Sequence, residues 1–492
     1  MKIICKIKKN VVTLYKKPMK KFSIFTLFTA LILSAYAERL AFPTAEGAGK
    51  YTWGGRGGQV LVVNSLADDG SPGTLRWAVY QEGARTVIFD VSGDIVLNSE
   101  LRIRNDSITI AGQSAPGDGI TIRNHTVFNA ANQVIVRFMR FRPGDELGVE
   151  IDAFEGRGQR DIILDHLSMS WANDEVASWY NNKNFTLQWS ILSEPLGDAG
   201  HERGVRGYMG LWGGNPGTFH HNLIAHSARR NPRLNGVRLR FWDRFGEFSE
   251  QVDFVNNVVY NWGNTENAYG GEGGRYNFMN NFFKPGPATP TGIQRERFIE
   301  AWARPDRNPG GVGAFVDYGL FHMTGNVMLG NPTLSADNWS GNGMLIAPPA
   351  GPSNRNHIDS LRVLTPFLPL AVNMRSAEEA FDVVLQRAGA SHRRDAIDAR
   401  IVEETRTGTY TFGDRGFINS QTDVGGWVVM NSEPVAPRTL RGTPSDDGIP
   451  DWFKLQHNLP LNENVANRYD LSPVFTNLEM FLNAIVEHIH QP

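Results

Sequence analysis

Phe219-His220-His221-Asn222-Leu223-Ile224 is the stretch of sequence that decides the fold. It joins two short apolar runs through a polar corner, and similar corners recur at Asp165-His166-Leu167-Ser168, Trp189-Ser190-Ile191-Leu192, Asn256-Asn257-Val258-Val259, Asn280-Asn281-Phe282-Phe283 and Gly325-Asn326-Val327-Met328. The closest spacing between equivalent positions is 24 residues, from 166 to 190 and from 257 to 281. A minimum period in the low twenties, with insertions on some turns, predicts an all-β solenoid, here a right-handed parallel β-helix.

Each corner follows a strand, and we align these strands by their apolar residues. The aligned runs are Ile108-Thr109-Ile110, Val134-Ile135-Val136, Ile162-Ile163-Leu164, Phe185-Thr186-Leu187, Phe219-His220-His221, Phe254-Val255-Asn256 and Tyr276-Asn277-Phe278. A coil of a solenoid buries its inward face only by stacking on the next coil. We therefore expect the aligned runs to occupy equivalent positions in successive coils.

The asparagines at the corners favour a structural role. At a corner that is repeated coil after coil, an asparagine side chain can satisfy main-chain groups and stack on the asparagine of the next coil. The sequence predicts such a ladder at Asn222, Asn257, Asn281 and Asn326. His166 and His221 share this corner, and we expect them to be buried structural histidines rather than catalytic bases.

Helical patterns occur where a solenoid needs its ends covered. Residues 74–81 are amphipathic and follow a turn, which predicts a short helix over the N-terminal end. Ser376-Ala377-Glu378-Glu379 is a capping box that opens a helix ending at Ala388. Further helices are predicted at 395–405, 451–456 and 477–488.

Four segments are predicted along the chain. They are a leader at 1–37, a β-helix domain at 38–345, a C-terminal extension at 346–440 that packs on the β-helix, and a tail at 441–492. The leader joins basic residues after Met19, an apolar run and a cleavage site at Ala35-Tyr36-Ala37, which indicates a signal peptide beginning at Met19. The tail contains Asp446-Asp447-Gly448-Ile449-Pro450-Asp451-Trp452, which resembles a degenerate calcium loop, although a helix-entry turn explains it nearly as well.

Cysteine usage agrees with export. The single cysteine, Cys5, lies in the leader, so the mature chain has neither a disulfide nor a thiol nucleophile. Outside the leader no apolar run is long enough to span a bilayer. We expect a secreted monomer, periplasmic or extracellular.

Arginines are concentrated on both sides of the stretch Phe219–Ile224, between positions 203 and 244. The region supplies Arg203, Arg206, Arg229, Arg230, Arg233, Arg238, Arg240 and Arg244, in a chain of net charge −2. A guanidinium group is a planar fork suited to carboxylate or phosphate. A solvated face is the simplest interpretation of one arginine, but eight in so short a span favour a groove for an anionic ligand.

A set of acidic residues lies upstream of the arginines, at Glu150, Asp152, Asp174 and Glu175. Side chains on successive coils approach closely, because neighbouring strands lie about 4.8 Å apart. These acids would serve as salt-bridge partners of the arginines. Alternatively a cation joins them, because clustered carboxylates repel one another, and oxygen ligands without His or Cys favour Ca²⁺.

Five motifs, taken in order, resemble those of the pectate lyase family (polysaccharide lyase family 1), in particular its exported bacterial branch. The motifs are Gly54-Gly55-Arg56-Gly57-Gly58, Gly73-Thr74-Leu75-Arg76, Ala111-Gly112-Gln113-Ser114-Ala115-Pro116-Gly117-Asp118-Gly119, Ile163-Leu164-Asp165-His166-Leu167-Ser168 and Arg230-Asn231-Pro232-Arg233. The resemblance implies an enzyme that cleaves polygalacturonate, which is de-esterified pectin, by β-elimination with Ca²⁺ as cofactor.

The resemblance also implies roles for individual residues. The metal ligands fall on Asp152 and Asp174, with Glu175 beside Asp174. The base that removes the C5 proton is the first arginine of the family's Arg-x-Pro-x-x-Arg motif, which is Arg230 here. The residues assigned to substrate carboxylates are Arg233, Arg203, Arg206 and Arg238, with Arg240 as a further candidate.

Two positions depart from the family's pattern. Ser178 stands where some relatives have a second acid, so either Glu175 substitutes for it or the metal site is weak without substrate. Asn235 replaces the final arginine of the motif, and its contacts must come from Arg233 or from later arginines. Arginine normally stays protonated, so an arginine base predicts an alkaline optimum.

The sequence disfavours other functions. A pectin lyase would act on methyl-esterified chains without Ca²⁺, which the retained Asp152 and Asp174 disfavour. A hydrolase would need paired carboxylates as acid and base, and adjacent Asp174 and Glu175 would diverge on a strand. A non-catalytic β-helix would bind acidic glycans through the arginines. The export signal and the acidic set both count against nucleic acid.

Overall fold

The structure is a computed structural model that describes residues 39–237, 249–263, 267–305, 315–348, 352–368, 370–431 and 445–491. Residues Leu40–Pro492 form one compact unit. The predicted leader, with its start at Met19, lies outside the described residues. Within the described ranges no helix is both long and apolar enough to cross a membrane.

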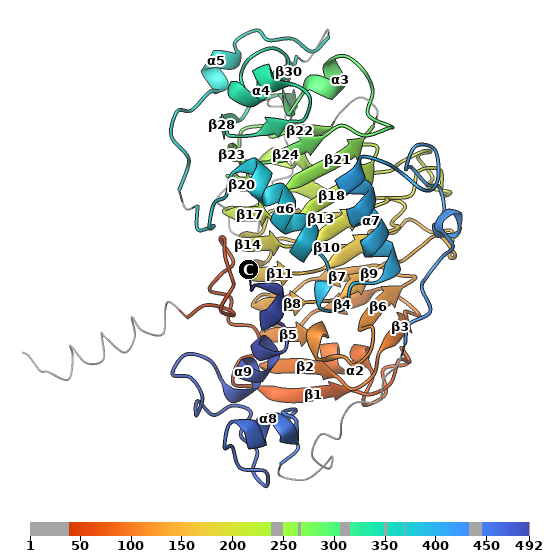
Figure 1. Cartoon of the computed structure of the whole chain (residues 1–492), viewed down its shortest axis with the longest axis vertical. Helices are drawn as coiled ribbons and strands as arrows, with labels where there is room; N and C mark the ends of the chain where they lie inside the picture. Colours follow the sequence, from red (N-terminus) through yellow and green to blue (C-terminus); the bar gives the residue numbers. More distant parts are fainter. Residues whose placement is uncertain are drawn as a thin grey trace, which may run out of the picture. The chain divides into compact units, whose positions relative to one another are not determined.

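Three parallel sheets form the sides of a stack of coils, and the chain passes through them in the same order on each turn (Figure 1). The first sheet joins β1 (Gln59–Val63), β2 (Arg85–Phe89), β5 (Ile108–Ala111), β8 (Val134–Arg137), β11 (Arg160–Asp165), β14 (Lys183–Gln188), β17 (Gly217–His220), β20 (Gln251–Val255), β23 (Arg275–Met279) and β28 (Leu320–Thr324). The second joins β3 (Gly93–Val96), β6 (Ile120–Arg123), β9 (Arg140–Phe141), β12 (Ser168–Ser170), β15 (Ile191–Ser193), β18 (Leu223–Ser227), β21 (Val258–Trp262), β24 (Phe282–Lys284) and β29 (Val327–Met328). The third joins β4 (Leu101–Ile103), β7 (Val127–Asn129), β10 (Phe154–Arg157), β13 (Ala177–Tyr180), β16 (Leu211–Trp212), β19 (Arg233–Leu234), β22 (Ala268–Gly270), β25 (Ile299–Trp302) and β30 (Met344–Ala347).

The remaining elements are short. The α-helices are α2 (Leu75–Tyr80), α3 (Ile293–Glu296), α4 (Pro332–Ala336), α5 (Ile358–Leu361), α6 (Ala377–Arg387), α7 (Ala396–Thr407), α8 (Asp451–Gln456) and α9 (Asn477–Ala484). The single turns of 3₁₀ helix are η1 (Gly112–Ser114), η3 (Ser391–Arg393), η4 (Gln421–Val424) and η5 (Glu487–Ile489), and β26 (Arg304–Pro305) pairs antiparallel with β27 (Phe315–Val316).

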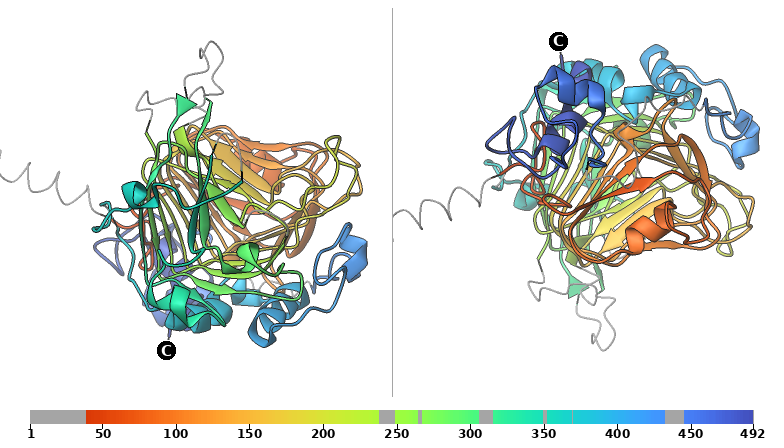
Figure 2. Two further views of the ribbon diagram at one scale, coloured as in Figure 1. Left: turned by 90° about the horizontal axis from the view of Figure 1, so that it is seen from above. Right: turned by 90° about the horizontal axis from the view of Figure 1, so that it is seen from below.

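The interior of the coils is filled by apolar side chains that alternate along each strand with outward-facing ones. Figure 2 looks along the stack, where the strands of the three sheets surround this interior. Trp179 and Phe185 stack with ring centroids 5.0 Å apart, and on the next coil Trp212 and Phe219 stack at 4.5 Å. All four side chains are buried. The predicted parallel β-helix is confirmed.

The pairing of strands between coils differs in register from the sequence prediction. Leu187, rather than Phe185, pairs with Phe219. In the same way Phe254 pairs with Phe278, two residues beyond its predicted partner. A shift of two residues leaves the same side chains facing inward, so hydrophobic alternation alone does not distinguish the two registers.

The predicted asparagine ladder is present at the corner between the first and second sheets. The side-chain Nδ2 of Asn222 donates to Oδ1 of Asn257 at 3.0 Å, and Asn257 donates in turn to Asn281 at 3.2 Å. Asn281 donates to Asn326 at 2.8 Å, and Asn326 to Asn338 at 2.9 Å. The side chains also accept main-chain N–H groups of the preceding coil, at 3.0 Å from Asn222. The ladder is confirmed, and Asn338 extends it by one rung.

Asn257→Ala is expected to lower the free energy of unfolding by roughly 2–4 kcal/mol. The substitution leaves the buried main-chain N–H of Asn222 and the carbonyl of Phe219 without their partners. Denaturation in guanidinium chloride measures the change. The exposed Asn462 provides a control, since its replacement by alanine should change stability by less than about 0.5 kcal/mol. Equal effects of the two substitutions would contradict a structural ladder.

His166 and His221 lie at the same corner in a column of stacked rings. His166 stacks on Phe138 with ring centroids 4.7 Å apart, and His221 stacks on Trp189 at 4.2 Å. Both imidazoles are buried, and His166 Nδ1 lies 2.7 Å from Asp165 Oδ1. Burial holds the pKa of His221 well below its ordinary value, so this ring is neutral. These contacts agree with the predicted structural role.

The predicted helices cover the end of the stack and two of its faces (Figure 1). Helix α2 closes the end next to β1, and Thr74 caps it by accepting a hydrogen bond from the Trp77 N–H at 3.2 Å. Helices α6 and α7 pack on the outer face of the second sheet, where Val384 joins the same apolar cluster as Leu223. Helices α8 and α9 pack on the first sheet near β1, β2 and β5. Helix α9 ends at Ala484, a few residues before its predicted end.

The aspartate-rich loop of the tail contains an internal ion pair. The fully buried Asp447 carboxylate lies 2.9 Å from Lys454 Nζ and accepts hydrogen bonds from the N–H groups of Ile449 and Val465. Among the described residues, no group of three metal-ligating side chains lies in this segment. The Lys454 ammonium therefore supplies the positive charge that a calcium ion would supply in a calcium loop.

Lys454→Met is expected to destabilise the protein by about 3–5 kcal/mol, because it leaves the Asp447 carboxylate buried without a counter-charge. The measurement is the midpoint of thermal or denaturant unfolding. The double variant Asp447→Asn with Lys454→Met removes both charges and should recover part of the loss. No recovery in the double variant would contradict this interpretation.

Candidate functional site

The acids and arginines singled out in the sequence meet at one edge of the third sheet. Asp152 precedes β10, Glu175 precedes β13, Tyr208 precedes β16 and Arg229 precedes β19. The main chain of Tyr208 forms parallel bridges with Glu175 on one side and with Arg229 on the other. Residues from four successive coils thus lie side by side, although up to 77 positions separate them in the sequence.

Three carboxylates form a compact group at this edge. Oxygen atoms of Asp152, Asp174 and Glu175 lie within 4.8 Å of one another, and the Glu175 N–H donates to Asp152 Oδ1 at 2.9 Å. Burial, and then the charge of Asp174, raise the pKa of Asp152 to about 7. The raised pKa shows that this carboxylate lacks sufficient compensating charge. An oxygen-only donor set with unbalanced negative charge fits Ca²⁺.

Guanidinium groups partly neutralise the same carboxylates. Arg206 binds Asp174 through Nε at 3.0 Å and through a second nitrogen, and Arg203 lies 3.3 Å from the other Asp174 oxygen. Burial raises the pKa of Asp174, but the hydrogen bonds and charge of Arg206 bring it below its ordinary value. Glu175 forms an ion pair with Arg230. The acid group and the predicted base are therefore in direct contact.

A second acidic group borders the first. His201 Nε2 lies 2.9 Å from a Glu150 oxygen and 3.6 Å from Asp174. Arg203 also binds Glu150, at 2.6 Å, and its side chain is 56% exposed. Arg203 can therefore leave these partners for a ligand, whereas the Arg206 side chain is 8% exposed and is held by Asp174.

Arg230 occupies an unusual backbone position. Its φ of 61° lies in the left-handed region, which non-glycine residues seldom adopt, and it falls between β18 and β19. In this conformation the side chain leaves the alternation of the neighbouring strands and points towards Glu175. Its side chain is 20% exposed, so the guanidinium reaches the surface beside the acid group.

Arg233 does not join this group. The residue is 5% exposed, and its guanidinium binds Glu272 at 2.6 Å. Asn235, which replaces the last arginine of the motif, is also buried and donates to Asn181 Oδ1 at 3.2 Å. Arg238 and Arg240 lie outside the described residues. Among the described arginines predicted to bind substrate, Arg203 and Arg206 are the two that lie at the acid group.

Glu155 is an acid of this region that the sequence analysis missed. It pairs across the strands with Ser178, the residue found where some relatives have a second acid. Ser178 donates a hydrogen bond to Asp152. Burial and the charge of Asp152 raise the pKa of Glu155 to about 8. Alternation along β10, where the preceding Phe154 is buried, places Glu155 on the outward face and was the available signal.

Neither Tyr208 nor His201 was assigned a role from the sequence. Tyr208 follows Arg206 by two residues, and the two side chains lie on the same face and contact each other. Alternation around an arginine beside the acids was the signal for Tyr208.

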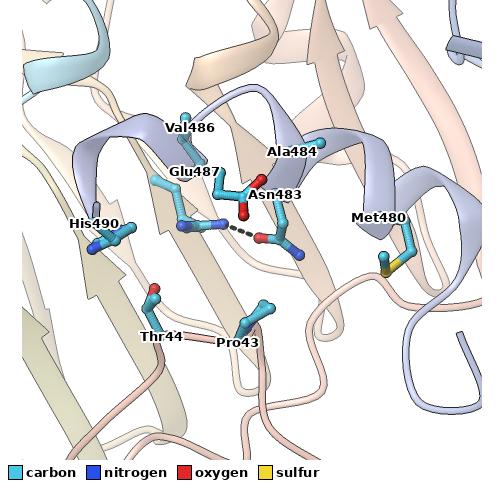
Figure 3. A pocket seen from close by; sticks show the side chains of 9 residues that line it. Pro43, Thr44, Met480, Asn483, Ala484, Val486, Glu487 and His490 are labelled. Atoms are coloured by element: carbon cyan, nitrogen blue, oxygen red, sulfur yellow. Dashed lines mark hydrogen bonds between the residues drawn. The ribbon is translucent and has the colours of Figure 1, made fainter. Parts of the chain in front are cut away.

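A cavity of about 360 Å³ lies elsewhere, between the N-terminal arm (residues 40–58) and the C-terminal helix α9 (Figure 3). Pro43 and Thr44 line one side, and Asn483 and His490 line the other. Arg137 donates to Asn483 Oδ1 at 2.8 Å across it. None of the predicted metal, base or substrate residues lines this cavity.

Comparison with curated proteins gives clear relatives. The chain is 31% identical over 469 residues to the probable pectate lyase C of Aspergillus flavus, which covers 94% of this chain and 98% of the relative. It is 32% identical over 463 residues to the probable pectate lyase C of Neosartorya fischeri, covering 93% and 96%. These relatives are fungal, so the predicted membership of an exported bacterial branch is not supported.

Other comparisons add less. A search with protein-family models found no match. Among solved structures, pectate lyase C from Erwinia chrysanthemi at pH 9.5 with Ca²⁺ aligns with a TM-score of 0.40 and 16% identity, over 72% of this chain and 98% of that one. At this similarity we take no residue roles from it. The fungal relatives match over nearly the whole of both chains, and the chain therefore belongs to the pectate lyase family.

Proposed function

We propose that this protein is a calcium-dependent pectate lyase that cleaves polygalacturonate by β-elimination. The observation that carries the proposal is the convergence of Asp152, Asp174 and Glu175 with Arg230 at one edge of the third sheet. An acid group that fits a hard cation and a partly exposed arginine in contact with it are the two parts that this reaction needs.

Asp152, Asp174 and Glu175 would hold the calcium ion. When bound, the ion would neutralise the uronate carboxylate of the substrate and make the neighbouring C5 proton more acidic. A neutral methyl ester offers no such charge for a metal to bind. The three carboxylates therefore favour pectate over methyl-esterified pectin as the substrate.

Arg230 would act as the base. In the elimination the C5–H proton passes to a nitrogen of the Arg230 side chain in its neutral, deprotonated form, and the C5 electron pair forms a double bond to C4. The C4–O bond breaks, and the leaving oxygen takes a proton from water; the hydroxide that remains takes the proton from Arg230 and restores the base. The arginine side chain has several nitrogens, so in the neutral form one N–H can remain near Glu175 while an unprotonated nitrogen faces C5. No hydrolytic water is consumed, and the product is unsaturated.

Arg203 and Arg206 would bind carboxylates of the substrate. Arg203 is the more exposed of the two and is held by Glu150 and Asp174 together. A calcium ion on Asp174 would weaken that attraction and make both guanidinium groups available to uronates. We also propose that Arg238 contributes, and that Arg233 supports the site from within through Glu272.

The export expected from the leader fits a substrate that is a polymer of plant cell walls. We propose that the protein is secreted and acts as a monomer. Residues 38–345 would form the catalytic domain, on which the extension at 346–440 packs.

The test is an assay on polygalacturonate with and without a calcium chelator. The proposal expects ultraviolet absorbance from the unsaturated product, lost with chelator and restored by added Ca²⁺. As a control, the chelator is removed and Ca²⁺ is added back, and recovery of activity shows that chelation did not damage the protein irreversibly.

Each rival gives a different result in the same assay. New reducing ends without ultraviolet absorbance would mean hydrolysis. Activity that is insensitive to chelator and greater on methyl-esterified pectin would mean a pectin lyase. No product at any pH, together with retention on a polygalacturonate column, would mean a non-catalytic glycan-binding β-helix.

A further inference from the structure

Tyr208 lies between the acid group and the arginines. Its main chain bridges Glu175 on the preceding coil and Arg229 on the following coil. The Val176 N–H donates to the Tyr208 carbonyl at 3.2 Å, so the position is fixed by the strand ladder. The residue is 7% exposed, and its ring is enclosed by the side chains around it.

Three guanidinium groups contact the Tyr208 ring. The guanidinium carbon lies 4.1 Å from the ring centroid for Arg206, 4.3 Å for Arg230 and 5.4 Å for Arg229. The attraction between a cation and an aromatic face is strongest where water is excluded. A single enclosed ring thus holds both the predicted base and a predicted substrate-binding arginine.

The same two guanidinium groups are the partners of the acid group. Arg206 binds Asp174, and Arg230 binds Glu175. In the proposed reaction these carboxylates would hold a cation, which would reduce their attraction for the arginines. The ring contact is uncharged on the tyrosine side and persists when the carboxylates are neutralised.

We propose that Tyr208 is a positioning residue for the Arg230 base: its ring keeps the Arg230 guanidinium beside the acid group. The inference rests on the proposed lyase function. It assigns the effect to the ring and not to the hydroxyl, because the hydroxyl oxygen accepts a hydrogen bond from Arg229, at 3.3 Å.

The first test compares Tyr208→Phe with Tyr208→Leu by steady-state kinetics on polygalacturonate. Phenylalanine keeps the ring, and its kcat should remain within about 3-fold of the wild type. Leucine keeps apolar bulk without a cation-binding face, and its kcat should fall by about 100-fold, because a displacement of about 1 Å at a reacting group has that effect. The KM of the leucine variant should also rise, because the same ring holds Arg206, and the fall in kcat is the result that reports Arg230. Circular dichroism and the melting temperature confirm that both variants fold.

The second test reads the position of Arg230 without using activity. Phenylglyoxal modifies accessible arginines, and mass spectrometry of the peptide that contains Arg230 gives the rate. We expect Tyr208→Leu to raise the rate at Arg230 by at least about 5-fold and Tyr208→Phe to leave it unchanged. The surface residue Arg102, whose side chain is 35% exposed, provides an internal reference that should not change.

The outcomes separate this inference from the function on which it rests. An inactive wild type would remove the lyase proposal, while the modification rates would still support or overturn the role of the ring. An active wild type with equal kcat in the Leu and Phe variants, or equal modification of Arg230 in both, would overturn the positioning role. A rise in KM at constant kcat would also overturn it, since that result indicates substrate binding.

Discussion

Arg230→Lys is expected to reduce kcat on polygalacturonate by at least about 10³-fold, within the range that a positioned general base contributes. The substitution keeps a basic side chain but replaces the several nitrogens of arginine with a single one. A lysine ammonium is a single nitrogen, so the nitrogen that pairs with Glu175 is also the one that would have to approach C5. The left-handed backbone at residue 230 fixes the origin of the side chain, and a shorter reach cannot be recovered by a small shift.

The measurement is the initial rate of ultraviolet absorbance at saturating substrate and calcium, with the melting temperature as a check on folding. Arg102→Lys serves as the control, because that residue lies at the surface on β4 and pairs with Glu100. We expect the control to retain nearly full activity. If Arg230→Lys kept more than about a tenth of the wild-type kcat, another group would be the base.

Asp152→Asn is expected to weaken calcium binding by at least about 100-fold and to reduce activity in proportion at low calcium. Loss of a group that only supports metal ligands costs about 10–100-fold in affinity, so loss of a ligand should cost at least as much. Asp152 also accepts the Glu175 N–H at 2.9 Å, and asparagine keeps that acceptor. The effect therefore reports charge rather than a collapse of the loop.

The raised pKa of Asp152 gives the same site a pH dependence. Its carboxylate is charged above about pH 7, and below that value a proton occupies it. Calcium must displace this proton, so the dissociation constant should rise by up to about 10-fold for each unit of pH below 7. Above about pH 8 the affinity should level off. Calcium affinity falls at low pH because the pKa of Asp152 in the folded protein lies above its ordinary value, so that a proton competes with the metal.

Isothermal titration calorimetry with Ca²⁺ measures both effects without substrate. The exposed Asp414 provides a matched control, since Asp414→Asn removes one negative charge away from the site. Unchanged calcium affinity in Asp152→Asn would remove this residue from the metal site. Affinity independent of pH between 5 and 8 would show that Asp152 is not the proton-competing ligand.

The fold could be predicted because its determinants repeat. An asparagine at one corner and an apolar pair after it recur in the sequence, and the structure places Asn222, Asn257 and Asn281 one above another. At this corner the closest spacing is 23 residues rather than 24, because Leu167, not His166, is equivalent to Ser190. Register errors of one or two residues arise because the inserted loops differ in length and the strand pattern repeats every two residues.

The candidate site was predictable in part. The acids and Arg230 precede strands of the same sheet, so the period alone brings them together. The burial of Arg233 was not predictable, because its partner Glu272 comes from the next coil, 39 residues later. His201 lies in a long irregular insertion between β15 and β16, where neither period nor alternation places a side chain.

The asparagine ladder shows that the height of the stack does not depend on how many residues each coil contains. From Asn257 to Asn281 one coil takes 24 residues, and from Asn281 to Asn326 it takes 45. Each step still advances the structure by a single strand spacing, about 4.8 Å. Insertions therefore widen the protein at the other corners without stretching its axis. A polymer bound along the stack at the edge of the third sheet would therefore meet binding groups at a constant spacing. The lengths of the intervening loops would not change this spacing.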